Sequence, residues 1–429
     1  MSPGKEIRVV GLIVSVAIFL APLLAAPAAT AKTTVVHMHY ANHGEAWLQW
    51  LRDREAAFEA ANPDIDIEII VSVDGTGVNQ LRAMAAGDAL PDVTEMALVY
   101  GAMFADEGFY LDLKPLIERD PDIDFGLFAP VTLDALTWTN GELWGLPADI
   151  YTVPAFFNID MFAEAGLANP NELGEGWDWD ALVEVGRKLS RDTDNDGVFD
   201  RKAITGLPGL WDHMDVVRKA GGMLFDRYKD PTQSRLNTPE VVGAIQWLID
   251  LYRVHGVLED GWFGVAQGTA AVGLTSGPSA VRSLNEAGIR FDVALQPRGP
   301  VSRASYTVTN SFQIIRTSQR AAEAWRWIKF LATEPESMER FAAITGRLPA
   351  LLPVAQRYGE FVINPPEHIN LILQTVLDPA SYHLPIGARA NEARSILNSY
   401  RSALVSGTMD VASALEDAHR RINALLGAE

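Results

Sequence analysis

Residues 35–98 alternate between extended and helical patterns, and this alternation constrains the fold of the chain most strongly. Short runs rich in β-branched residues predict strands, while apolar residues three or four positions apart, such as Trp47, Leu48 and Leu51, predict helices. In order, the pattern predicts a strand over 35–40, a helix over 45–61, a strand over 65–73, a helix over 79–86 and a strand over 92–98. This order predicts a parallel or mixed sheet with helices on its faces.

Polar side chains stand where these strands end. Ligands bind beyond the carboxyl ends of the strands in such sheets. We therefore expect ligand contacts from Asn42 and His43 after the first strand, Asp74 after the second, and Glu95 in the third extended run.

Residues 140–167 predict a strand–strand–helix unit. Asn140-Gly141 is a turn signal, two extended runs follow, the second over 153–158, and a helix begins near Asp160. Gly166 is placed to end that helix. Further helices are predicted over 239–255, 321–332 and 411–426.

The N-terminus has the pattern of a secretory signal peptide. Lys5 and Arg8 precede an apolar run over 9–24, and the small residues 29–31 follow it. The run is shorter than the roughly 20 residues of a membrane-spanning helix, so we expect residues 1–31 to be removed after Ala31. The chain has no cysteine for lipid attachment, so we expect a periplasmic protein that is not a lipoprotein.

Composition excludes several classes of function. With 35 Lys and Arg against 55 Asp and Glu, the formal net charge is −20, which repels nucleic acid and anionic membranes. The absence of cysteine excludes disulfides, thiolate metal sites and a cysteine nucleophile.

Several segments, in order along the mature chain, carry a resemblance to a known family. They are AFEAANPDIDIEI (57–69), LRAMAAGDALPDV (81–93), GFYLDLKPLIE (108–118), NGELWGLP (140–147), FNIDMFAEAGL (157–167), WFGVAQGTAAVGLTSG (262–277), VALQPRGP (293–300) and GRLPA (346–350). Together they resemble the family-1 sugar-binding proteins of ABC importers, related to maltose-binding protein. Phe157 and Ile159 depart from that family's pattern.

The resemblance implies a two-lobe α/β periplasmic-binding-protein fold of the maltose-binding type. Each lobe would be a mixed sheet flanked by helices, and the chain would cross three times between an N-terminal lobe (32–146 plus 277–333) and a C-terminal lobe (147–276 plus 334–429). The lobes would close on a carbohydrate by hinge motion, without bond-making chemistry. The closed form, which we expect to be a monomer, would dock on an ABC permease.

An acidic loop has most of a calcium-binding pattern. Asp192, Asp194, Asp196 and Asp200 provide side-chain oxygens, Val198 a backbone carbonyl, and Gly197 the sharp turn. The bidentate ligand expected at position 12 is absent, because that residue is Ala203. An ordinary acidic turn gives the same composition. We expect no cofactor for function, with Ca²⁺ as a candidate structural ion.

Aromatic and polar residues are the candidates for a sugar site, because sugar rings stack on aromatic planes and polar groups fix their orientation. Trp138 and Trp247 we assign to helix cores instead. The remaining candidates, beyond the four strand-end residues, are Trp144, Asp149, Tyr151, Trp211, Trp262, Thr275, Ser276, Tyr306, Asn310 and Arg347.

Three alternatives are open at this stage. An anionic ligand, such as glycerol phosphate or a sugar acid, would need Arg303, Arg347 or Arg389 in the cleft. A calcium-dependent periplasmic enzyme acting on glycans would need paired carboxylates. Zinc at His37, His39 and His43 is disfavoured, because zinc needs three or four converging ligands and strand alternation alone explains the first two.

Overall fold

The first sheet of the computed structural model contains the predicted alternation. The structure describes residues 1, 4, 32–206 and 209–427, so the predicted signal peptide lies almost wholly outside the described residues. The strands β1 (Thr33–His39), β2 (Ile65–Val71) and β3 (Val93–Ala97) pair in parallel. The antiparallel strand β12 (Asn310–Ile314) and then β4 (Leu146–Pro147) complete the order β2-β1-β3-β12-β4. The predicted mixed sheet is confirmed.

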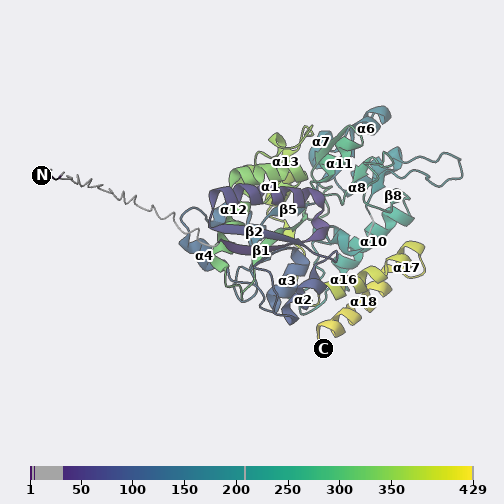
Figure 1. Ribbon diagram of the computed structural model, residues 1–429. Helices are drawn as coiled ribbons and strands as arrows, with labels where there is room; N and C mark the ends of the chain where they lie inside the picture. The colour runs from purple at the N-terminus through teal and green to yellow at the C-terminus, as the bar shows by residue number, and fades with distance from the viewer. Residues whose placement is uncertain (2–3, 5–31, 207–208, 428–429) are drawn as a thin grey trace.

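Helices cover both faces of this sheet. In Figure 1, α1 (Glu45–Ala61), α12 (Ala321–Thr333) and α13 (Pro335–Thr345) lie above β1 and β2, and α2 (Val78–Ala86) and α3 (Leu98–Asp106) lie below. The helices α1 and α13 are tied together by Trp50 Nε1, which donates to the carbonyl of Ser337 at 2.9 Å.

A second sheet forms the core of the other lobe, on the right of Figure 1. Its order is β10 (Phe291–Ala294), β6 (Ala155–Asn158), β9 (Val272–Gly273), β7 (Ile204–Thr205) and β8 (Leu258–Glu259). Around it lie α6 (Ile159–Ala165), α8 (Trp179–Leu189) and α10 (Pro239–Arg253). The αL conformation of Gly166 ends α6 as predicted.

A third, four-stranded sheet links the two lobes. Its order is β13 (Leu348–Pro349), β5 (Asp149–Thr152), β11 (Tyr306–Val308) and β14 (Tyr382–His383). Because β5 and β11 are each only a residue or two from a strand of the first sheet, this small sheet is where the chain passes between lobes.

The predicted lobe boundaries differ from the strand pairing in two places. We expected residues 277–333 in the N-terminal lobe, but β10 pairs with β6 in the second sheet, so the return to the first lobe comes after residue 294. We also expected residues 334 onward in the C-terminal lobe, but α13 packs on α1 of the first lobe. The boundaries themselves stay a prediction.

Further helices complete the fold. They are α4 (Lys114–Arg119), α5 (Pro130–Leu136), α7 (Pro170–Leu173), α9 (Met214–Lys219), α11 (Ala280–Glu286), α14 (Leu352–Ala355), α15 (Asn370–Leu377), α16 (Ala390–Ser399), α17 (Arg401–Ser406) and α18 (Val411–Leu426), with 3-10 turns at Ala41–His43, Phe125–Leu127, Gly174–Gly176, Trp211–His213 and Tyr358–Glu360. The helices predicted near 239–255, 321–332 and 411–426 are confirmed as α10, α12 and α18.

The prediction that Trp138 lies in a helix core is right about its burial and wrong about the helix. Its side chain is buried, but it lies beyond the end of α5, in the turn closed by the bridge between Thr137 and Leu143. Trp247 does lie in a helix, α10, where its ring stacks on Trp179 with centroids 3.9 Å apart.

Candidate functional site

The linking sheet holds a polar group built on Asp149. Asp149 is buried, and its carboxylate accepts from the backbone N and the Nδ2 of Asn310 at 3.0 and 2.8 Å. Arg347 Nη1 donates to the other oxygen at 2.9 Å. The guanidinium also lies over the ring of Trp47, 5.2 Å from its centroid. Three of the predicted residues therefore meet where the lobes join.

Tyr151 lies beside this group on β5. Its hydroxyl donates to the carbonyl of Thr275 at 2.9 Å, and its ring stacks on buried Tyr306 with centroids 6.3 Å apart. Burial raises the pKa of the Tyr151 phenol, and the negative charge of Asp212 adds to that rise. The phenol therefore stays protonated and acts as a donor at neutral pH.

A cavity of about 200 Å³ opens next to Tyr151. Aromatic side chains of Tyr151, Phe156, Trp262 and Phe263 line it, together with the hydroxyl-bearing residues Ser276, Ser279 and Ser283. Ser276 Oγ donates to the carbonyl of Trp262 at 3.1 Å, which ties the two predicted residues together. Thr275 is buried beside them, and its Oγ1 has no hydrogen-bond partner among the residues that the structure describes.

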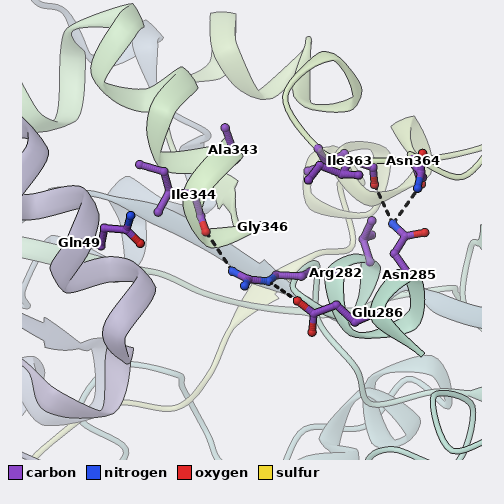
Figure 2. Close-up of a pocket in the computed structure, with 11 residues that line it drawn as sticks. Gln49, Arg282, Asn285, Glu286, Ala343, Ile344, Gly346, Ile363 and Asn364 are labelled. Atoms are coloured by element: carbon purple, nitrogen blue, oxygen red, sulfur yellow. Dashed lines mark hydrogen bonds and ion pairs between the residues drawn. The ribbon is translucent and has the colours of Figure 1, made fainter. Parts of the chain in front are cut away.

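A separate, larger cavity, of about 460 Å³, lies along the other side of α11. Figure 2 shows Gln49 of α1 and Ile344 near the end of α13 facing Arg282 of α11 across it. Arg282 donates to Glu286 at 2.8 Å and to the carbonyl of Ile344 at 3.1 Å. The Arg282–Ile344 contact thus bridges α11 and the end of α13.

The predicted strand-end residues of the first lobe, Asn42 and Asp74, make local hydrogen bonds within their loops. Asn42 is exposed, and its Nδ2 donates to the Tyr40 hydroxyl at 3.4 Å. Asp74 accepts from Thr76 and Gln80, and these hydrogen bonds outweigh burial and lower the pKa of its carboxyl. Asp74 therefore organises the start of α2, where a carboxylate is favourable.

Glu95 is not a cleft residue. Its side chain is fully buried, and its oxygens face Trp47 Nε1 at 2.8 Å, His39 Nδ1 at 2.5 Å and His43 Nδ1 at 2.9 Å. The prediction of ligand contact by Glu95 is corrected, because α1 and the turn Ala41–His43 cover the face of β3 on which Glu95 stands. His43 is held in the same cluster, stacked on Trp47, and burial lowers its pKa.

Two predicted tryptophans are core residues. Trp144 is 2 % exposed, and its ring stacks on Tyr110 and packs so closely on Gly101 that a Cβ there would lie 2.7 Å from it. Trp211 is equally buried and packs edge-to-face on Phe225. Both predictions are corrected, because these rings are used in packing within a lobe and leave no surface for a ligand.

Three of the four aspartates predicted as ligands in the acidic loop lie close together. Carboxylate oxygens of Asp192, Asp194 and Asp200 lie within 4.8 Å of one another. Asp192 also accepts from the backbone N of Gly197 at 2.9 Å, across the turn. Asp196 accepts instead from Val198 N at 2.8 Å. Ala203, at position 12 of the calcium-binding pattern, is buried in the core around the second sheet, and its side chain has no ligand atom.

Several residues near the cavities were not predicted. Phe263 and Arg282 line them, and a half-buried ion pair joins Asp212 to Arg394 at 3.0 Å. Burial raises the pKa of Asp212, and Arg394 opposes the rise. Phe263 directly follows the predicted Trp262 in the sequence, and Asp212 directly follows the predicted Trp211. This adjacency is the sequence signal that points to Phe263 and Asp212.

Two α/β lobes, a linking sheet and cavities along the junction define a two-lobe binding protein. Within the part of the chain that the structure describes, no helix is both long enough and apolar enough to span a bilayer. The chain matches the bacterial extracellular solute-binding protein family over residues 54–368, and it belongs to that family.

Relatives and solved structures agree with this assignment. A binding protein of Brucella abortus (strain 2308) is 23% identical over 419 residues, which cover 93% of this chain and 95% of that protein. The arabinooligosaccharide-binding protein of Bacillus subtilis (strain 168) is 31% identical over 113 residues, 26% of this chain and 24% of that one. An ABC substrate-binding protein from Listeria monocytogenes in complex with cycloalternan has a TM-score of 0.78 at 21% identity, covering 93% of this chain and all of that one. The sugar-binding protein MalE of Xanthomonas citri has a TM-score of 0.76 at 20% identity, and the match covers 92% of this chain and 98% of that one.

Proposed function

We propose that this protein captures a carbohydrate between its lobes by hinge closure and delivers it to the permease of an ABC importer. The observation that carries the proposal is the cavity lined by Tyr151, Trp262 and Phe263, directly beside the linking sheet. A ligand there touches the part of the molecule that must bend when the lobes close.

The chemistry of this cavity suits a sugar. Aromatic rings offer flat apolar faces to the C–H groups of a pyranose or furanose ring. The serine hydroxyls of residues 276, 279 and 283 can donate and accept, as a polyol requires. None of the described residues that line this cavity is charged, which fits a neutral solute.

The ligands named for relatives support the same class. Besides the arabinooligosaccharide-binding and cycloalternan-bound proteins, a maltotriose-binding protein of Pyrococcus abyssi is 23% identical over 301 residues, covering 67% of this chain and 61% of that protein. These proteins differ in their sugars but share an oligosaccharide ligand, so we propose an oligosaccharide here.

An anionic ligand is the weaker alternative, because each candidate arginine already has acceptors. Arg347 is paired with Asp149, and Arg389 is exposed and paired with Glu392. Arg303 donates to the carbonyls of Trp177, Gln296 and Gly174. Binding an anion would mean giving up these contacts.

A glycan-active enzyme is a further alternative, and we propose that the protein is not one. A catalytic pair of carboxylates needs one group free to donate a proton and another free to attack or to activate water. Asp149 and Glu95 each accept several hydrogen bonds from protein donors. Incubating the purified protein with a labelled glycan should leave the glycan intact.

The remaining parts of the proposal concern location and ions. We propose that cleavage after Ala31 releases the mature chain into the periplasm and that it acts there as a monomer. The converged oxygens of Asp192, Asp194 and Asp200 support a structural Ca²⁺ in the acidic loop.

Scattering with and without ligand tests the capture mechanism. Ligand shifts a population of open molecules to closed ones through its differential affinity for the two states. The radius of gyration of residues 32–429 should therefore fall when a bound sugar, identified by calorimetry, is added. Sugar binding with no change in the radius would contradict hinge closure.

A further inference from the structure

Glu95 is the centre of a buried cluster that the sugar site does not use. His39 Nδ1 and His43 Nδ1 both face the same carboxylate oxygen, Oε1, at 2.5 and 2.9 Å. The two nitrogens and a carboxylate oxygen lie within 4.8 Å of one another. All three residues are at most 7 % exposed. The three ligating atoms come from β1, the turn before α1 and β3, so three separate segments meet at one point.

The second carboxylate oxygen is already occupied by the protein. Trp47 Nε1, which can only donate, lies 2.8 Å from Oε2. His37 Nε2 lies 3.4 Å from the same oxygen. The Nδ1 of His37 must be an acceptor, because Trp327 Nε1 donates to it at 2.9 Å. In the neutral ring, His37 therefore carries its proton on Nε2, facing Glu95.

This division of roles resembles the organisation of a metal site. Oε1 and the two Nδ1 atoms form an inner set, while Trp47 donates a hydrogen bond to Oε2 and so orients the carboxylate, as an outer partner of a metal ligand does. Two imidazole nitrogens and one carboxylate oxygen are also a ligand set that Zn²⁺ accepts.

The distances need only a small change. Tetrahedral Zn²⁺ holds nitrogen and oxygen ligands at about 2.0–2.2 Å, which places ligand atoms roughly 3.3 Å apart. An opening of less than about 1 Å from the observed 2.5 and 2.9 Å would give that spacing.

We propose that His39, His43 and Glu95 form a binding site for a divalent transition-metal ion of the Zn²⁺ class. From the sequence, zinc at His37, His39 and His43 is disfavoured because strand alternation alone explains the first two; the structure instead brings Glu95 together with His39 and His43. The ion would fasten to β3 the turn Ala41–His43, which also carries the exposed Asn42. This inference does not depend on the proposed carbohydrate function.

The test uses the mature full-length protein and Zn²⁺ alone, without any sugar. After removal of metal with a chelator and dialysis, titration with Zn²⁺ should show one tight equivalent by elemental analysis and raise the Tm by mass action. His43→Gln should weaken this binding at least about 100-fold, and Trp47→Phe about 10- to 100-fold, as for loss of an outer partner. His368→Ala is the matched control, because His368 belongs to a separate cluster with Asp292 and Glu367, and it should bind as the wild type does.

A second measurement protects against variants that fail to fold. Co²⁺ bound to the unaltered protein should give visible absorption bands of a tetrahedral site with nitrogen and oxygen ligands, and Zn²⁺ should displace it. The proposal is overturned if wild-type protein takes up no tight equivalent of Zn²⁺. It is also overturned if His368→Ala removes the binding while folded His43→Gln keeps it. Because no sugar is present, neither outcome bears on carbohydrate binding.

Discussion

Arg347 Nη1 lies 2.9 Å from Asp149 Oδ2, and this ion pair joins two segments that are 198 residues apart in the chain. Asp149 begins β5 and Arg347 directly precedes β13, and the two strands are neighbours in the linking sheet. The pair therefore fixes how one lobe-crossing segment lies against another, beside the cavity that we assign to the ligand.

Asp149→Asn should destabilise the protein by about 2 kcal/mol. Breaking a fully buried pair costs about 3–5 kcal/mol, and we expect less here because the Arg347 side chain is 26 % exposed and can recover some hydration. Urea unfolding measures the change. Asp160→Asn, which breaks the exposed pair with Arg290, is the control and should cost less than about 1 kcal/mol. Equal losses in the two variants would contradict a special role for the Asp149 pair.

Trp262→Ala should weaken carbohydrate binding by about 10- to 100-fold, because aromatic residues supply much of the binding energy in such sites. The fold should survive, since Trp262 is only partly buried. Trp247→Ala serves as the control: Trp247 is also partly buried, but it stacks on Trp179 away from the Tyr151 cavity. Calorimetry on both variants makes the comparison, and an unchanged affinity in Trp262→Ala would remove Trp262 from the site.

Gly277→Ala should displace the ring of Tyr151. A Cβ at residue 277 would lie 2.1 Å from Tyr151 Cε2, so either the ring or the turn must move. We expect a clear loss of ligand affinity and a change in the environment of Tyr151 that NMR can detect. Gly176→Ala, where a Cβ meets no atom within 4 Å, should behave as wild type. Full affinity in Gly277→Ala would show that the position of Tyr151 is not needed.

Calcium should raise the Tm by roughly 2 °C or more at saturating concentration, since an ion that binds only the folded state stabilises it. A variant with Asp192, Asp194 and Asp200 changed to Asn should lose this response. Asp88→Asn, at an exposed position outside the loop, should keep it. A calcium response that persists in the triple variant would place the ion elsewhere.

Stability should fall as pH drops from about 6.5 to 4, with a contribution from His213. Burial lowers the pKa of His213 from 6.5 to about 4. Between these values the unfolded chain binds a proton that the folded protein does not, so acid favours unfolding. The contribution approaches about 3 kcal/mol at the lower end of the range. Urea unfolding at several pH values should show a shallower dependence for His213→Leu, and identical slopes would contradict the assignment.

Local features were predictable from the sequence. Asp192, Asp194 and Asp200 of the acidic loop lie close together because they are near neighbours in the chain and Gly197 permits the turn, so spacing indicates this part of the geometry. The helix over Glu45–Ala61 and the α6 stop at Gly166 follow equally from local spacing and backbone conformation.

Features that depend on distant packing were not predictable. Glu95 stands where a strand leads toward a cleft, and only the packing of Trp47 over it shows that it is a core carboxylate. Trp144 precedes a lobe crossing in the sequence. Because Gly101 has no side chain, the ring of Trp144 can enter the core of the first lobe. Neither contact has a local signal, because each joins segments more than 40 residues apart.

A thermal-shift screen of residues 32–429 against mono-, di- and oligosaccharides, polyols and sugar phosphates tests the central claim most directly. Ligand that binds the native state raises the Tm. The account predicts a clear rise with one class of neutral carbohydrate, and a much smaller rise with the same sugar in Trp262→Ala. A rise with a sugar phosphate and with no neutral carbohydrate would contradict it.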